Sequence, residues 1–120
     1  MITIEPDTYF EDGIVITDYK DILIDLDVIK RSFNKRRTIA NDKESLVLLK
    51  VNALSSLGQE VQDFIISDEV IKHTKAVAIV PTSKAAAIIS NTFLSSSSSP
   101  YPIQVFKEIE NAKDWLNSIG

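Results

Sequence analysis

Two nearly continuous apolar runs, residues 46–51 (LVLLKV) and 76–80 (AVAIV), constrain the fold of this chain more than any other feature. Each run has the length of a β-strand, and neither alternates apolar and polar side chains as a strand with one wet face does. Strands of this kind are covered on both faces, which is typical of parallel sheets. Parallel neighbours need a crossover connection, usually a helix. The two runs therefore predict an α/β domain with a largely parallel sheet.

The chain before the first run predicts an antiparallel hairpin and a helix. Residues 8–11 and 14–17 are rich in β-forming side chains and flank an Asp-Gly pair. That pair favours a type I′ turn, because both central residues of the turn need positive φ. Asp25 then precedes apolar side chains at helical spacing and can cap the helix, with cationic residues at the far end. We expect this helix over residues 26–38.

Between the two apolar runs, the sequence predicts two short helices. Ser56 and Gln59 have the spacing of a capping box, and Ser67 can cap the second of these helices. After the second run, Ser83 can cap a longer helix. The inner face of that helix is expected to consist of Ala85, Ile88, Ile89, Thr92 and Phe93.

The end of the chain predicts a polar loop, a strand and a last helix. Residues 95–99 are all serine and form a segment with no means of packing. Residues 103–106 alternate and predict a strand near the sheet edge, and Glu108 precedes a helix with one apolar face. The order is ββαβαβαβα, an open mixed sheet in which an N-terminal hairpin is followed by βα repeats with helices packed on the sheet. Residues 1–120 are expected to form one domain.

Composition and charge exclude several classes of function. The net charge of −4 disfavours a general nucleic-acid binder, whose affinity depends on neutralising phosphates. The chain has no cysteine, so a disulfide framework and a thiolate metal site are excluded. No apolar run approaches the roughly 20 residues of a membrane span, and the N-terminus does not read as a secretory leader. We expect a cytoplasmic protein.

The sequence shows no recognisable combination of catalytic side chains. His73 is the single histidine, lies between Lys72 and Lys75, and is interpreted as a loop residue before the next strand. The sequence shows no glycine-rich phosphate loop, nucleophile elbow or Cys-x-x-Cys pair. We therefore predict no enzyme activity, no cofactor and no bound metal.

Two charged clusters have both a functional and a structural interpretation. An acidic cluster could suggest a hard metal ion, but apolar residues 22–24 interrupt it and Asp25 has a capping role. A basic cluster could contact phosphates or an acidic partner, yet a solvated helix face explains it equally and is favoured. The acidic cluster is Asp18, Asp21, Asp25 and Asp27, and the basic one is Lys30, Arg31, Lys35, Arg36 and Arg37.

Several segments resemble the STAS-like (anti-sigma-factor-antagonist-like) family of small bacterial domains, some of which are described as STAS/SEC14-type. The resemblance covers nearly the whole chain. It rests on the N-terminal hairpin, the Ile-Asp-Leu helix start, the Leu-Leu-Lys-Val strand, the stretch 64–69 (FIISDE), and Val105-Phe106-Lys107-Glu108 followed by Ala112 and Trp115-Leu116. It implies an open sheet with packed helices.

The resemblance also implies a phosphoacceptor serine near the start of the helix after the third strand, where Ser55 and Ser56 lie. A phosphate there would meet the amides of a helix N-terminus. The alternative is that Ser56 is a helix cap and nothing more.

The leading functional expectation is a non-catalytic regulatory domain that binds an unidentified protein partner. Partners of open α/β sheets tend to meet the carboxyl ends of the parallel strands. The residues expected at that edge are Asn52, Ala53, Leu54, Thr82 and Ser83. The alternative expectation is a carrier of a small apolar or lipid-like ligand, which the SEC14-type likeness implies. A homodimer formed through the edge strand near Val105 is also expected as an assembly.

Overall fold

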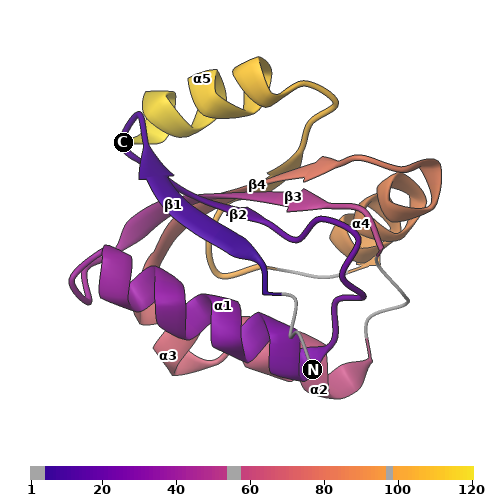
Figure 1. Cartoon of the computed structure of the whole chain (residues 1–120), viewed down its shortest axis with the longest axis horizontal. Coiled ribbons are helices and arrows are strands. Elements are labelled where there is room, and N and C mark those ends of the chain that lie inside the picture. Colours follow the sequence, from indigo (N-terminus) through magenta and orange to yellow (C-terminus); the bar gives the residue numbers. More distant parts are fainter. Residues whose placement is uncertain (1–4, 54–57, 97–98) are drawn as a thin grey trace.

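The computed structural model describes residues 5–53, 58–96 and 99–120 and contains a single sheet with helices on both faces (Figure 1). The elements in chain order are β1 Asp7–Glu11, β2 Ile14–Asp18, α1 Leu26–Ile39, β3 Ser45–Val51, α2 Gln59–Ile65, α3 Asp68–Lys72, β4 Thr74–Pro81, α4 Lys84–Ser96, β5 Ile103–Val105 and α5 Ile109–Ile119. This order is the predicted one, with the segment between β3 and β4 divided into two short helices.

The two apolar runs form the central strands β3 and β4, which pair in parallel with Leu48 opposite Ala78. The sheet has five strands in the order β1-β2-β3-β4-β5. The β1–β2 pair is antiparallel, and every later pair is parallel. The predicted α/β mixed sheet is therefore confirmed, and β5 is the edge strand expected near Val105.

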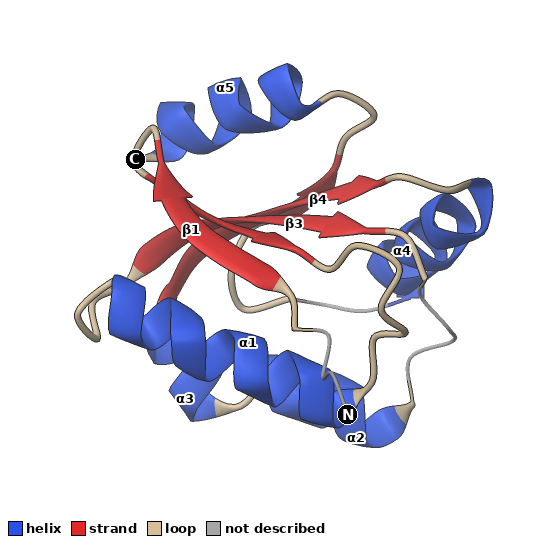
Figure 2. Ribbon diagram, in the orientation of Figure 1, coloured by secondary structure: helices blue, strands red, loops and turns tan. Residues whose placement is uncertain are grey.

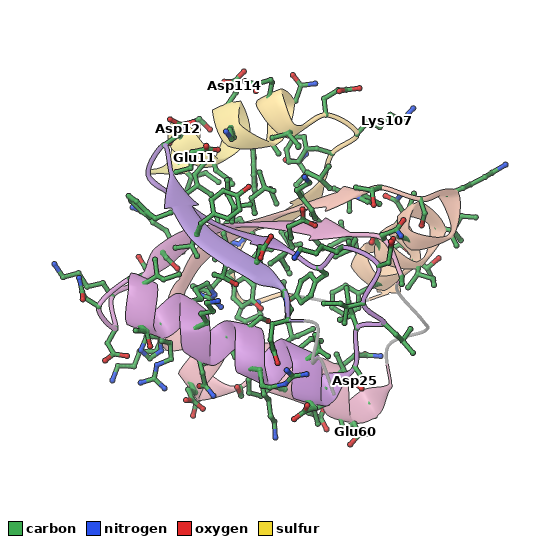
Figure 3. All side chains as sticks on the ribbon, viewed as in Figure 1. Glu11, Asp12, Asp25, Glu60, Lys107 and Asp114 are labelled. Atoms are coloured by element: carbon green, nitrogen blue, oxygen red, sulfur yellow. The ribbon has the colours of Figure 1, made fainter. Side chains whose placement is uncertain are left out.

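The hairpin turn has the predicted type I′ geometry. Asp12 has a φ of 56° and Gly13 a φ of 80°, so both central residues are left-handed. The Lys113 ammonium group binds Glu11 at 2.8 Å and Asp12 at 3.2 Å, which joins the hairpin to α5 (Figure 3). The hydrogen bonds that Lys113 donates to Glu11 and Asp12 hold its pKa above the ordinary value.

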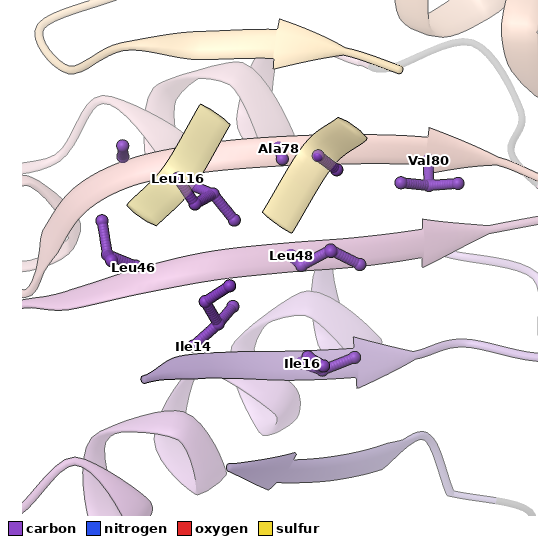
Figure 4. Packing of buried hydrophobic residues seen from close by; sticks show 9 residues of the cluster. Ile14, Ile16, Leu46, Leu48, Ala78, Val80 and Leu116 are labelled. Atoms are coloured by element: carbon purple, nitrogen blue, oxygen red, sulfur yellow. The ribbon is translucent and has the colours of Figure 1, made fainter. Parts of the chain in front are cut away.

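The sheet has one thinly covered face and one thickly covered face (Figure 2). On the α5 face, Leu116 and Ala112 of α5 pack against side chains that alternate along β2, β3 and β4 (Figure 4). These strand residues are Ile14, Ile16, Leu46, Leu48, Ala76, Ala78 and Val80. The opposite face, here called the α1 face, is covered by α1, α2, α3 and α4.

Helix α1 begins as predicted. The Asp25 carboxylate accepts a hydrogen bond from the Val28 amide at 2.9 Å, which satisfies one of the unpaired donors of the first turn. Val28 and Phe33 are buried against the sheet. The cap and the apolar stripe together fix where this helix starts and which side faces inward.

The predicted capping box before α2 is wrong. Gly58 is the N-cap, so the helix begins at Gln59 rather than after Ser56, which lies outside the described residues. The Gln59 side chain donates to Asp63 at 2.8 Å, one turn ahead, instead of reaching back. Ser67 does precede α3, but its hydroxyl bonds to the Phe64 carbonyl at 2.6 Å and so ends the preceding helix.

Helix α4 differs from its prediction in length and in rotation. Ser83 caps it by accepting from the Ala86 amide at 3.1 Å, as expected, but the helix continues to Ser96 and so includes two residues of the predicted serine loop. Ala85, Ile88 and Thr92 are exposed, not inward, and 59% of Ile88 is accessible. Ala86 and Ser90 are buried in their place. Because residues 85–89 are all apolar, the pattern alone does not fix the rotation.

Helix α5 has the predicted face, with Ala112 and Leu116 buried and Trp115 against Phe106. Glu108 occupies the N-cap position, although its side chain makes no capping bond. None of the helices in the described ranges has the length and apolar character needed to cross a membrane.

Candidate functional site

The described residues of the predicted partner-binding edge lie together at the carboxyl ends of β3 and β4. The Ser83 hydroxyl donates to the Asn52 carbonyl at 2.8 Å, and the Thr82 amide donates to the Val51 carbonyl at 2.8 Å. Ala53 follows Asn52 at the same edge. Leu54, Ser55 and Ser56 lie outside the described residues, so the phosphoacceptor remains a prediction.

Structural contacts already use much of this edge. The Asn52 side-chain amide donates to the Asp21 carboxylate at 2.6 Å, and the Ile24 amide donates to the Ala53 carbonyl at 3.1 Å. These bonds hold the β2–α1 loop against the end of β3. A partner-binding role for Asn52, Ala53, Thr82 and Ser83 remains a prediction beside this structural one.

His73 lies between α3 and β4, as predicted, but it is buried. One ring nitrogen bonds to the Glu69 carbonyl at 2.8 Å, and the ring packs edge-on against Phe33. These contacts give His73 a structural role. Within the described residues, no group of three or more His, Cys, Asp or Glu side chains could hold a metal ion.

The basic cluster of α1 is divided between solvent and interior. Arg31 pairs with Asp27 at 3.0 Å and with Glu5, and Arg37 pairs with Asp42 at 3.0 Å. The predicted solvated helix face is confirmed for Lys30 and Lys35, which are exposed, whereas Arg31 and Arg37 are half-buried. The prediction is wrong for Arg36, which is 8% exposed.

A cavity of about 130 Å³ lies on the α1 face, between the sheet and the helices. Leu49 of β3 and Ile79 of β4 line it and are only half-buried, although both belong to central strands. Central strands of a covered sheet are normally buried on both faces. The helices therefore leave part of the α1 face uncovered at this point.

Side chains from all four helices of the α1 face contribute to the cavity wall. Phe33 of α1 and Phe64 of α2 meet edge to face with their ring centroids 5.7 Å apart. Phe93 and the small Ser90 are contributed by α4. The wall is mainly apolar, so the cavity suits an apolar group.

Two tyrosines contribute to the wall, and the hydroxyl group of each already makes a hydrogen bond. Tyr19 shares a hydrogen bond of 2.7 Å with the Ser32 hydroxyl. Tyr101 donates to the Ile65 carbonyl at 2.8 Å. By contrast, the Ser90 Oγ is buried and has no hydrogen-bond partner among the described residues.

Arg36 crosses from α1 to the amino ends of β3 and β4. Its Nη1 donates to the His73 carbonyl at 2.9 Å and to the Ser45 hydroxyl at 3.3 Å, and its Nη2 donates to the Thr74 hydroxyl at 3.2 Å. The guanidinium group lies 4.8 Å from the centroid of the Phe33 ring. All of these partners are neutral.

Burial sets the charge of the cavity wall. It lowers the pKa of Arg36 to about 10 and raises the pKa of Tyr101 to about 12. Burial also raises the pKa of Tyr19, against the opposing effect of the Ser32 hydrogen bond. At neutral pH the guanidinium group is therefore charged and both phenols are neutral. The wall carries a net positive charge.

A family model described as "Domain of unknown function (DUF7793)" matches residues 8–120. The chain belongs to this family. No curated protein and no solved structure matches it.

Sequence reasoning missed the cavity of this DUF7793 domain, although one signal for Arg36 was available. Ile29, Phe33 and Arg36 follow one another at spacings of four and three residues, which places all three on one helix side. Grouping Arg36 with its charged neighbours hid that spacing. Ser90 and the cavity itself gave no comparable signal.

Proposed function

We propose that this DUF7793 domain is a non-catalytic binding domain for a small, mainly apolar ligand, held in the cavity on the α1 face. The observation that carries the proposal is the apolar void above Leu49 and Ile79, two half-buried residues of central strands. Concave apolar sites with a few polar groups are the usual form of small-molecule sites. The polar groups available to a ligand here are the Ser90 hydroxyl and the guanidinium group of Arg36.

The volume of the cavity limits the size of the ligand. A dry cavity of about 150 Å³ lined by Leu, Ile and Phe can hold benzene, whereas sites for drug-sized molecules span roughly 300–1,000 Å³. At about 130 Å³, the present cavity matches one aromatic ring or a short alkyl chain. A lipid-like ligand would place only one short segment inside.

Benzene is a direct probe of this site. We expect it to bind the wild-type chain with a Kd near 1 mM, because six carbon atoms at about 0.7 kcal/mol each give roughly −4 kcal/mol. Ile79→Trp should abolish that binding by placing an indole ring in the cavity. Amide chemical shifts of β3 and β4, followed by NMR during a benzene titration, measure both effects.

Ile88→Trp is the matched control, since it makes the same chemical change on the exposed side of α4. It should leave benzene binding unaltered. The proposal fails if benzene does not shift the amides of β3 and β4, or if Ile79→Trp binds benzene as the wild type does while folded by circular dichroism.

A second candidate function is the regulatory one, in which a protein partner docks at the carboxyl edge of the sheet. What supports it is an exposed leucine there: Leu23 is 58% accessible and precedes Ile24, which bonds to Ala53. The STAS-like resemblance points to the same edge and remains a proposal. Its support is the order of elements, with a hairpin followed by βα units.

Phosphorylation offers a test of that second candidate. If the edge is phospho-regulated, protein isolated from its native host should include a species heavier by one phosphate, located at Ser55 or Ser56 by fragmentation. Phosphatase treatment should remove the added mass. A single unmodified mass from growing and from starved cells would count against a phosphoswitch.

A further inference from the structure

Ser90 is the polar side chain of the cavity whose burial is best explained by a bound ligand. It is 2% exposed, lines the cavity, and its Oγ lacks a hydrogen-bond partner within the described part of the chain. A serine in a helix can bond to a carbonyl one turn earlier, as Ser32 does with Ile29 at 3.0 Å. Buried hydroxyl groups without partners are unfavourable. A ligand atom that pairs with Ser90 would remove that penalty.

Arg36 indicates the charge of the ligand. Three hydrogen bonds join it to neutral oxygen atoms, whereas a guanidinium group has five N–H donors. Among the described residues that line the cavity, Arg36 is the only charged one, so no carboxylate there balances it. Buried charges in proteins are as a rule paired. The missing counter-charge would be supplied by an anionic ligand.

We propose that the ligand is a small amphiphile with one anionic group, of the aryl or short-chain carboxylate class. Its apolar body packs on Leu49 and Ile79, and its carboxylate accepts hydrogen bonds from Ser90 and from the unused N–H groups of Arg36. This inference rests on the proposed function and adds the chemical class of the ligand. A cavity of about 130 Å³ accommodates the ring of such a ligand.

Benzene, benzyl alcohol and benzoate form a probe series that separates the body of the ligand from its charge. We expect benzoate to bind the wild-type chain about tenfold more tightly than benzyl alcohol at pH 7. The reason is that hydrogen bonds to an ionised acceptor are about twice as strong as neutral ones. Binding is measured by NMR titration of the full chain with each probe.

Ser90→Ala tests the proposed role of the hydroxyl group. Benzoate affinity should fall about five- to tenfold, and benzene affinity should stay within about twofold. The same change should raise the Tm of the unliganded protein by about 3–5 °C, because it removes an unpaired buried hydroxyl. Ser95→Ala is the matched control in the same helix, at an exposed serine, and should alter neither benzoate binding nor Tm.

The outcomes distinguish this inference from the proposed function. If benzene binds but benzoate binds no more tightly than benzyl alcohol, the anionic class is wrong and the apolar site remains. If none of the three probes binds, both proposals fail. If benzoate is preferred and Ser90→Ala leaves its affinity unaltered, the assignment of Ser90 is wrong.

Discussion

Replacing Arg36 with alanine is expected to lower the free energy of unfolding by about 3 kcal/mol. The side chain is 8% exposed and joins α1 to the amino ends of β3 and β4 through Ser45, Thr74 and the His73 carbonyl. Alanine removes all three hydrogen bonds at once. Urea denaturation at pH 7 measures the loss.

Two opposing contributions set that magnitude. Hydrogen bonds from a charged donor stabilise by about 2 kcal/mol each, or about 6 kcal/mol for the three. Burial lowers the pKa of Arg36 from its ordinary value to about 10, which corresponds to a cost of about 3 kcal/mol for keeping the charge. The bonds exceed the cost, so the residue stabilises the fold overall.

The pH dependence of the loss follows from the direction of the pKa shift. Because the folded pKa is the lower one, the unfolded chain holds this proton more tightly, and stability rises with pH from about 10 up to the pKa of the unfolded chain. Below pH 10 both states are charged. The effect of Arg36→Ala should therefore be the same at pH 6 and pH 8.

Lys35→Ala is the control for Arg36→Ala, since Lys35 is the exposed neighbour in the same helix. It should change stability by less than about 0.5 kcal/mol. A loss below about 1 kcal/mol for Arg36→Ala would contradict the expectation, because it would mean that the cost of burying the charge cancels the hydrogen bonds.

The fold could be predicted from the sequence because local signals and burial agreed. The runs at 46–51 and 76–80 are apolar except at Lys50, which predicted strands covered on both faces. The turn before β2 and the cap at Asp25 depend on backbone geometry that few residue types satisfy. Where several residues in succession could face inward, as at 85–89, the sequence left the rotation of α4 undetermined.

The candidate site could not be predicted in the same way, because a cavity is an empty space between side chains and no sequence pattern marks it. Its volume depends on how closely the four helices of the α1 face approach Leu49 and Ile79, and no periodicity in the sequence encodes that spacing. In the sequence, nothing distinguishes Ser90 from the other serines of the chain. Only the rotation of α4, which exposes Ile88, shows that Ser90 is buried. The site became visible only when the packing of distant segments was known.

Leu116→Ala is expected to be as disruptive as the loss of Arg36, through packing instead of charge. Leu116 is fully buried, and it fills the space between α5 and the apolar side chains of β2, β3 and β4. Truncating a buried leucine to alanine lowers stability by roughly 2–5 kcal/mol, and we expect about 3 kcal/mol here. Leu23→Ala, the same change at a residue that is 58% exposed, should cost less than about 1 kcal/mol.

Amide hydrogen exchange in the Leu116→Ala variant shows whether α5 unfolds together with the sheet. Among the described residues, α5 is the only helix on its face of the sheet, and Lys113 also joins it to the hairpin. Because the strands beneath α5 are central, weakening its contact should speed amide exchange in β3 and β4 as well as in α5. Faster exchange confined to α5 would mean that the helix is a separable appendage and that the α1 face alone holds the sheet together.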